Sequence, residues 1–232
     1  MKNVNREQFS ENFIGSHKYV ESIIGSMELK HKSVLDIGCG FGWFIYQCLQ
    51  FEPSFIGGIE ISEVDLETAK NDKRLQRAEF LVGSALATGY PDSFFDLVTA
   101  WEVLEHIPKG SEQLMFDEIY RILKPNGIAI ISTPYKDLRS IALDPAFYFG
   151  HRHYSLKRIL EFSYKSNLLV QSAFVKGGWP QILFMMNLYL SKWVFRRGPF
   201  FLRSFSKILE KDWDSRDGFS NVYVKLQKSV YL

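Results

Sequence analysis

Three glycines at alternate positions follow a short apolar segment and constrain the fold more than any other feature of the chain. Residues 33–37 are apolar enough for a buried strand, and Gly38, Gly40 and Gly42 come directly after them. Glycines let the backbone turn tightly and let a ligand approach the peptide groups. The helix expected over residues 42–51 would present free N–H groups to an anionic part of that ligand. This segment therefore predicts a strand–loop–helix unit that binds a ligand.

Strand-like segments alternate with amphipathic segments through the first half of the chain. Ser62 and Ser111 stand where helices are expected to begin, because a serine hydroxyl can cap a helix. Alternating strands and helices form a parallel sheet covered on both faces. We therefore predict an α/β fold with strands at residues 33–37, 54–60, 78–82, 94–101 and 128–132, helices at 13–27 and 42–51 and after each serine, and a helix-ending turn at 124–127.

The pattern changes after residue 133. We expect an aromatic loop at residues 134–150, a helix that Ser155 caps, and strands at residues 168–176 and 220–228. The two strands are separated by a segment with a helical pattern of its own, which makes it an insertion rather than a linker.

This insertion spans residues 177–218, with helices expected near residues 181–196 and 200–211. We predict a single domain over residues 1–232, with an N-terminal helical extension at residues 1–30 and the insertion covering the substrate side.

The net charge of +2 hides an uneven distribution. From residue 176 onward the chain has 10 basic and 4 acidic residues, whereas the first 175 residues have 18 and 22. Nucleic-acid binding through bulk charge is not expected at this balance. Cys39 and Cys48 are the two cysteines, too few for a disulfide framework. The polar start and the absence of a long apolar run predict a cytoplasmic protein.

Two carboxylates flank the glycine segment. Glu60 ends the second expected strand, where it can accept hydrogen bonds from both ribose hydroxyls of a nucleoside. Asp36 stands two residues before the first glycine, and the spacing is G-x-G-x-G rather than the dinucleotide pattern G-x-G-x-x-G. Because a carboxylate repels a pyrophosphate but suits an ammonium and a sulfonium, the pattern favours S-adenosylmethionine and disfavours a nicotinamide dehydrogenase.

Five segments in this order resemble the class I S-adenosylmethionine-dependent methyltransferases, and more narrowly the small-molecule group with a Glu-Val-Leu-Glu-His segment. They are residues 36–42, 58–62, 95–98, 102–107 and 123–127. The resemblance covers about residues 30–176 and the last strand. It implies a Rossmann-like sheet of seven mostly parallel strands with helices on both faces, an antiparallel last strand and a helical insertion before it.

The resemblance also implies a site for S-adenosylmethionine, or for its product S-adenosylhomocysteine. Asp36, Gly38 and Gly40 would hold the methionine end of the cofactor. Glu60 would bind the ribose and Ile61 would pack on the adenine.

Further cofactor contacts are expected after the third and fourth strands. Ser84 and Ala85 would reach the adenine edge, although the family commonly has an aspartate where Ser84 stands. Trp101 is expected to form a wall of the cofactor pocket. Cys39 lies inside the glycine loop, where a small space-filling role is the expectation.

Methyl transfer to an alcohol oxygen needs a base as well as positioning. The candidates are ionisable side chains near the carboxyl ends of the strands, where an open α/β sheet binds its ligands. They are Glu102, His106, Tyr135, His151 and His153.

Each of these side chains also has a structural interpretation. His106 equally suits loop capping, Glu102 suits the acceptance of backbone hydrogen bonds, and the segment His151–Arg152–His153–Tyr154 suits a solvated turn. No metal is expected, because no third ligand stands at a recognisable spacing from the two histidines.

The sequence thus predicts a methyltransferase that acts on a small molecule, with oxygen as the favoured acceptor atom. The candidate substrates are a sugar, a quinone-like ring and a lipid-linked compound. The segment after the fourth strand lacks the Asn/Asp-Pro-Pro-Tyr/Phe pattern of enzymes that methylate nucleobase or glutamine amino groups. The alternative is a methyltransferase-like protein that binds the cofactor without catalysis. Ser84 and the absence of an obvious base motivate it.

The expected helix at residues 181–196 is apolar around nearly its whole circumference. A lid that is buried against the sheet and the substrate is the favoured interpretation. The alternatives are a peripheral membrane contact through residues 181–207, where basic residues flank aromatic ones, and a homodimer interface.

Overall fold

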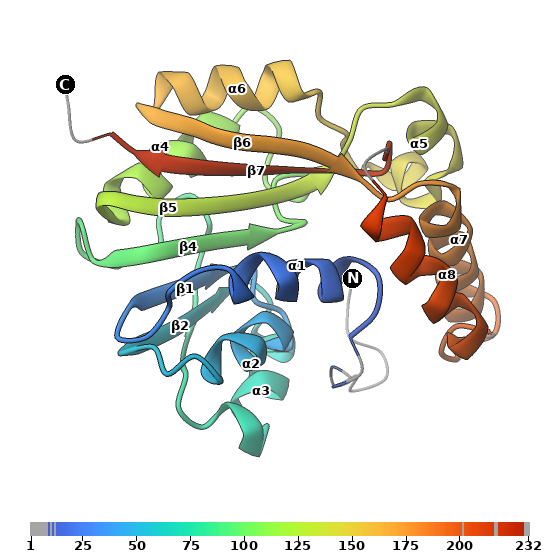
Figure 1. Cartoon of the computed structure of the whole chain (residues 1–232), viewed down its shortest axis with the longest axis horizontal. Helices are drawn as coiled ribbons and strands as arrows, with labels where there is room; N and C mark the ends of the chain where they lie inside the picture. The colour runs from blue at the N-terminus through green and yellow to red at the C-terminus, as the bar shows by residue number, and fades with distance from the viewer. Residues whose placement is uncertain (1–8, 10, 12, 201, 216–217, 230–232) are drawn as a thin grey trace.

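A computed structural model describes residues 9, 11, 13–200, 202–215 and 218–229 of the chain. One sheet runs through it in the strand order β3-β2-β1-β4-β5-β7-β6 (Figure 1). Neighbouring strands from β1 to β5 are parallel, and β7 is antiparallel to both β5 and β6. The expected seven-stranded sheet with an antiparallel last strand is confirmed. Its strands are β1 (Ser33–Ile37), β2 (Phe55–Glu60), β3 (Glu79–Val82), β4 (Phe95–Trp101), β5 (Leu123–Pro134), β6 (Leu168–Lys176) and β7 (Asn221–Lys228).

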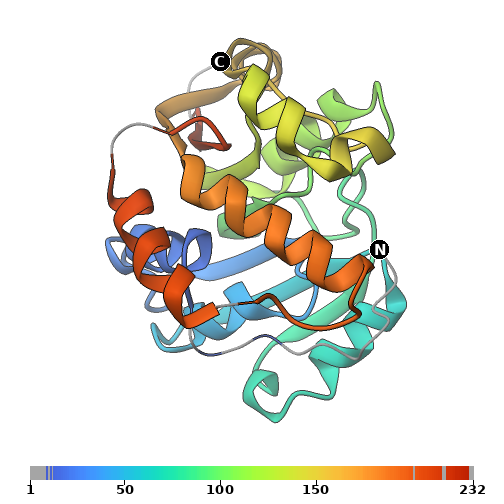
Figure 2. The same cartoon turned by 90° about the vertical axis from the view of Figure 1, so that its right-hand side faces the viewer.

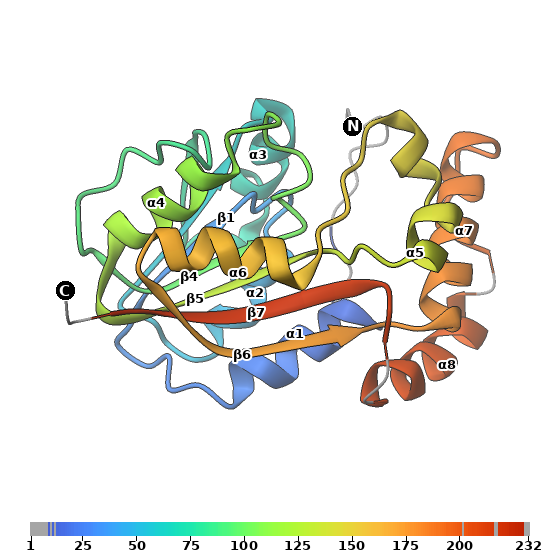
Figure 3. The same ribbon diagram turned by 90° about the horizontal axis from the view of Figure 1, so that it is seen from above.

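Helices cover both faces of the sheet. One hydrophobic cluster joins it to α4 and α6, and a second joins it to α1, α2, α3 and α8. Figure 3 shows α4 and α6 on one side and α1 on the other. The helices are α1 (Ser16–Gly25), α2 (Trp43–Leu49), α3 (Glu63–Lys70), α4 (Glu112–Ile122), α5 (Leu138–Leu143), α6 (Leu156–Lys165), α7 (Trp179–Trp193) and α8 (Leu202–Asp214).

Serine caps explain two of the helix starts. The Ser62 hydroxyl accepts a hydrogen bond from the Asp65 N–H at the start of α3, and Ser155 does the same for Arg158 in α6. Ser111 precedes α4 as expected, but the prediction that its hydroxyl caps this helix is wrong. The hydroxyl donates to the Pro108 carbonyl and makes no cap hydrogen bond.

Two other local expectations are corrected. The segment at residues 134–150 is not a plain loop, since it contains α5 and a 3₁₀ segment, η2 (Pro145–Phe149). Asp137 and Asp144 cap these two elements with their side chains. The turn at residues 124–127 lies within β5, where Asn126 has a φ of 64° and the pairing with β4 shifts.

The helices α7 and α8 lie beyond the ends to which β4 and β5 point (Figure 1), and α7 runs across that end of the molecule (Figure 2). Asp212 of α8 accepts hydrogen bonds from the Gly178 and Gln181 N–H groups at the start of α7. These bonds join the two helices. The expectation of a helix buried against the sheet is wrong for most of α7, because only Ile182 and Ser191 in it are buried.

Candidate functional site

The glycine loop after β1 has the conformation that its residues suggest. Gly38 and Gly40 have φ values of +70° and +50°, which side chains rarely adopt. A Cβ atom on Gly38 would clash with Val103, which follows β4. A Cβ atom on Gly40 would meet nothing within 4 Å. The loop is therefore packed at Gly38 and leaves open space at Gly40.

Asp36 is a buried carboxyl beneath this loop, with 1% of its surface exposed. Its Oδ1 accepts a hydrogen bond of 2.7 Å from the Thr99 hydroxyl. Its pKa is raised to about 8, mainly by burial and in smaller part by the charge of Glu60, while the hydrogen bond from Thr99 opposes the rise. An ammonium group brought close to Asp36 would favour its ionised form.

Glu60 is held at the end of β2 by two backbone groups. Its Oε2 accepts from the Gly40 N–H at 3.1 Å and its Oε1 accepts from the Ser62 N–H at 3.0 Å. Each carboxylate oxygen keeps further acceptor capacity, so the side chain can still bind two ribose hydroxyls. Ile61 follows with 77% of its surface exposed, next to the open part of the loop. These positions fit the nucleoside part of S-adenosylmethionine.

The other expected cofactor contacts lie around these residues. The Gly83 N–H donates to the Glu60 carbonyl and so brings the segment of Ser84 and Ala85 beside β2. The Ser84 hydroxyl accepts from the Leu86 N–H at 3.2 Å, while Ala85 is buried.

Cys39 and Trp101 are both buried beside the loop. Burial raises the pKa of the Cys39 thiol well above its usual value, with the charges of Asp36 and Glu60 adding to the effect. The Trp101 ring packs on Phe44 at 5.2 Å between centroids. Its indole Nε1 is buried and lacks a hydrogen-bond partner in the described part of the chain. That unpaired donor suits a ligand acceptor.

A pocket of about 580 Å³ lies at the carboxyl ends of β4 and β5. Four of the five candidate bases line it, and α7 contributes Met185, Tyr189 and Trp193 to the lining. The fifth candidate, Tyr135, packs against the hydrophobic core instead. The structure thus brings together side chains from four separate parts of the chain, including Glu102, Glu105, His106, Asp144, Phe149, His151, His153, Met185, Tyr189, Trp193 and Asn221.

Glu102 is the first residue after β4 and has a φ of 55°. Its Oε1 accepts from the Ser132 hydroxyl at 2.6 Å and its Oε2 accepts from the Asn221 amide at 2.8 Å. Burial raises its pKa. The side chain therefore bonds to neighbouring side chains rather than to backbone N–H groups.

The two histidines of the segment after η2 share one carboxylate. Asp144 Oδ2 lies 3.3 Å from His151 Nδ1 and 3.0 Å from His153 Nε2. Burial opposes its ionisation, but these hydrogen bonds hold the pKa of Asp144 well below its usual range. His153 Nδ1 also lies 3.1 Å from the Tyr135 carbonyl, so its ring is fully engaged.

His106 and His151 are in contact within the pocket, with 3.1 Å between their Nε2 atoms. The surrounding protein atoms and the neighbouring His151 lower the pKa of His106, although 61% of its side chain is exposed. The exposed side chain is not engaged in loop capping.

Sequence reasoning missed three residues of this region: Glu105, Asp144 and Arg152. Arg152 donates to the carbonyls of Leu104 and Glu105, so its segment is not a solvated turn. An aspartate before proline is a common helix-start signal, which could have drawn attention to Asp144. Glu105 carried no signal beyond its place next to His106.

Comparisons with known proteins agree with this fold. Residues 35–131 match the family model of the methyltransferase domain. A ubiquinone biosynthesis O-methyltransferase of Neisseria meningitidis serogroup C is 32% identical over 126 residues, which are 52% of each chain. A sterol 24-C-methyltransferase of Neurospora crassa is 30% identical over 125 residues, 52% of this chain and 32% of that protein. The chain therefore spans about half or less of the length of these relatives.

A solved structure also matches most of the chain. The S-adenosylmethionine-dependent methyltransferase of Mesorhizobium loti aligns with a TM-score of 0.63 at 16% identity, over 92% of this chain and 98% of that one. This likeness concerns the fold. The chain thus has the Rossmann-like fold of S-adenosylmethionine-dependent methyltransferases, and its residues 35–131 match the methyltransferase domain.

Proposed function

We propose that this protein transfers the methyl group of S-adenosylmethionine to an oxygen atom of a small-molecule acceptor. The observation that supports the proposal is the position of the pocket with Glu102, His106, His151 and His153. Val103 packs against Gly38 of the glycine loop and lies between Glu102 and His106 in the chain. The acceptor pocket and the cofactor loop are thus adjacent.

The chain's own residues would position the reactants and exclude water. S-adenosylmethionine supplies an activated methyl group on a sulfonium, so a hydroxyl acceptor must be aligned with it and lose its proton. Asp36 would pair with the ammonium group of the cofactor, and Glu60 would accept from its ribose hydroxyls. His106 and His151 bring their Nε2 atoms within 3.1 Å of each other in the pocket where we place the acceptor hydroxyl.

The pocket favours an acceptor with a polar head and an apolar body. Its lining combines ionisable side chains with the apolar or aromatic side chains of Met185, Tyr189 and Trp193 from α7. Two relatives are named for ubiquinone biosynthesis and for sterol methylation, which involve apolar molecules. We therefore place lipid-like hydroxylated compounds, including quinone-like rings, ahead of free sugars.

The outer face of α7 also favours a lipid-like acceptor. Apolar side chains recur there every three or four residues and are 39–54% exposed, namely Trp179, Leu183, Met186 and Leu190. We call them the α7 stripe. No helix in the described residues is long and apolar enough to span a membrane. We propose that the stripe rests on a membrane surface, with the nearby cations Arg196, Arg197 and Lys207 facing anionic headgroups.

Calorimetric titration with S-adenosylmethionine and S-adenosylhomocysteine tests the cofactor site. We expect the native chain to bind both, and Gly40→Arg to weaken binding at least about a hundredfold, because an arginine would fill the open space at Gly40. The matched control is Gly89→Arg, because Gly89 is exposed and, like Gly40, has a positive φ (79°) and open space within 4 Å of where a Cβ atom would stand. Equal binding by both variants would argue against the site.

A transfer assay tests the reaction itself. Methyl-labelled cofactor is incubated with the native chain and with phenolic and alcoholic lipids, and the methylated product is identified by mass spectrometry. We expect an O-methyl product. Cofactor binding without transfer to any acceptor would instead favour the non-catalytic binding protein.

A further inference from the structure

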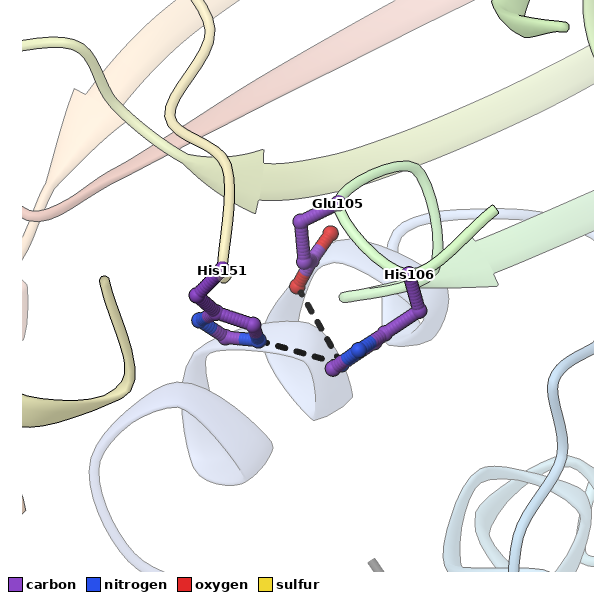
Figure 4. A group of neighbouring side chains, drawn as sticks. All are labelled: Glu105, His106 and His151. Carbon is purple, nitrogen blue, oxygen red and sulfur yellow. Dashed lines mark hydrogen bonds and ion pairs between the residues drawn. The ribbon is translucent and has the colours of Figure 1, made fainter. Parts of the chain in front are cut away.

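Three side chains of the acceptor pocket point toward one another: Glu105, His106 and His151 (Figure 4). Each offers one ligand atom, and the three atoms lie within 4.8 Å of one another. His106 Nε2 lies 3.1 Å from His151 Nε2 and 4.0 Å from Glu105 Oε1. The loop after β4 supplies two of these side chains and the segment after η2 supplies the third.

Glu105 gives this cluster an unpaired buried acceptor. Its side chain is 0% exposed. The Oε2 atom accepts from the Thr133 hydroxyl at 2.9 Å, whereas Oε1 has no hydrogen-bond partner in the described part of the chain. A buried carboxylate oxygen without a partner is costly, since it has lost its water. Oε1 lies on the side of His106, where a cation could satisfy it.

The two imidazoles are arranged as metal ligands usually are. The hydrogen bond with Asp144 assigns the proton of His151 to Nδ1, which leaves the Nε2 lone pair directed at the cluster. Two nitrogens on one tetrahedral ion at about 2.0–2.1 Å are roughly 3.3 Å apart, close to the spacing of the His106 and His151 Nε2 atoms. The longer gap to Glu105 can close by rotation of His106, whose side chain is 61% exposed.

We propose that Glu105 Oε1, His106 Nε2 and His151 Nε2 bind one divalent transition-metal ion of the zinc type. Two imidazoles and one carboxylate are typical of zinc sites that keep an open position, and imidazole disfavours magnesium. The sequence predicts no metal because it shows only two histidines at short spacing. The fold supplies Glu105 as the third ligand.

The consequence for catalysis rests on the proposed function. A metal ion at the cluster would bind the acceptor hydroxyl and lower the pKa of that hydroxyl, whose proton would pass to water. The two histidines would then hold the ion that activates the acceptor rather than remove the proton themselves.

Cobalt binding tests the site without any substrate. The full chain is treated with a chelator, dialysed and titrated with Co²⁺, followed by visible absorption, with Zn²⁺ as competitor and metal content measured by mass spectrometry. We expect one Co²⁺ per chain, displaced by Zn²⁺. Glu105→Gln, His106→Ala and His151→Ala should each weaken Co²⁺ binding at least tenfold, and Asp144→Asn should weaken it about 10–100-fold.

The matched control is His31→Asn, because His31 is exposed and has a φ of 61° that asparagine tolerates. Circular dichroism checks the fold of every variant. If Glu105→Gln does not fold, the Co²⁺ titration of His106→Ala tests the site instead. This variant should fold, because it removes an exposed side chain. No Co²⁺ binding by the native chain, or unchanged binding by His106→Ala, overturns the metal site.

The calorimetric cofactor titration separates the two proposals. If the chain binds the cofactor but no metal, the proposed function is retained and the metal site is rejected. If the chain binds no cofactor but binds metal in a manner that depends on His106, the metal site is retained and the proposed function is rejected.

Discussion

Asp36 is a buried carboxyl beneath the glycine loop, and we propose that it contributes to the cofactor site. Burial is the largest influence and raises its pKa to about 8, while the Thr99 hydrogen bond opposes the rise and the charge of Glu60 adds to it. At neutral pH most Asp36 carboxyls in the ligand-free protein therefore carry a proton. The ionised form is the one that pairs with an ammonium group.

The affinity for S-adenosylmethionine should therefore depend on pH in one direction. Below about pH 8 a proton must leave Asp36 when the ammonium group binds, so the affinity should rise with pH from 6 to 8, by up to about tenfold per unit. Calorimetry at several pH values measures this. Asp36→Asn should bind more weakly and lose the slope, and an equal slope in both proteins would contradict the assignment.

The helix α7 has three faces with different surroundings. Ile182 and Ser191 are buried, and Met185 and Tyr189 line the acceptor pocket. The α7 stripe points outward. The predicted lid is therefore only one aspect of this helix, because an insertion that packs by one side leaves its remaining apolar residues uncovered.

The α7 stripe should bind lipid vesicles. Leu183→Asp with Leu190→Asp should abolish co-sedimentation with vesicles of phosphatidylcholine and phosphatidylglycerol, because two charges would have to enter the interface. Val64→Asp on α3, where Val64 is 59% exposed, is the matched control and should still sediment. The opposite outcome is a native chain that forms a dimer and binds no vesicles, together with a double variant that is monomeric. That outcome would identify the stripe as a dimer interface instead.

Trp213 links several elements of the molecule. Its ring contacts Tyr19 of α1 at 5.5 Å and Tyr223 of β7 at 5.8 Å between centroids. Its indole Nε1 donates to the Gln181 side chain of α7 at 3.0 Å. With 2% of its surface exposed, Trp213 attaches α8 to the sheet and so holds α7 beside the pocket.

Trp213→Ala should therefore destabilise the whole chain. Removing a buried tryptophan costs about 3–5 kcal/mol in free energy of unfolding. For a chain of this size, each kcal/mol lowers Tm by about 2–4 °C. Thermal unfolding followed by circular dichroism should show a drop of about 6–20 °C. Trp179→Ala is the control, since Trp179 is 52% exposed, and similar losses in both variants would contradict the role of Trp213.

Local patterns predicted much of the fold. The strands β1 and β6 occupy the residues that their sequence indicates, and Ser62 and Ser155 cap the expected helices. These features depend on neighbours within a few residues, so they are visible in sequence. The helical content of residues 134–150 was missed because aromatic residues and Asp-Pro obscure two short capped segments.

The amino-acid sequence by itself determined the glycine loop, the carboxylates Asp36 and Glu60, and the α/β class, because each follows from local spacing and periodicity. Only the tertiary structure decided which side chains share the acceptor pocket. His106 and His151 are 45 residues apart in the chain, and their Nε2 atoms meet at 3.1 Å because β5 and α5 return the chain to the same end of the sheet. The unpaired oxygen of Glu105 likewise arises from burial, which packing creates and sequence spacing does not show.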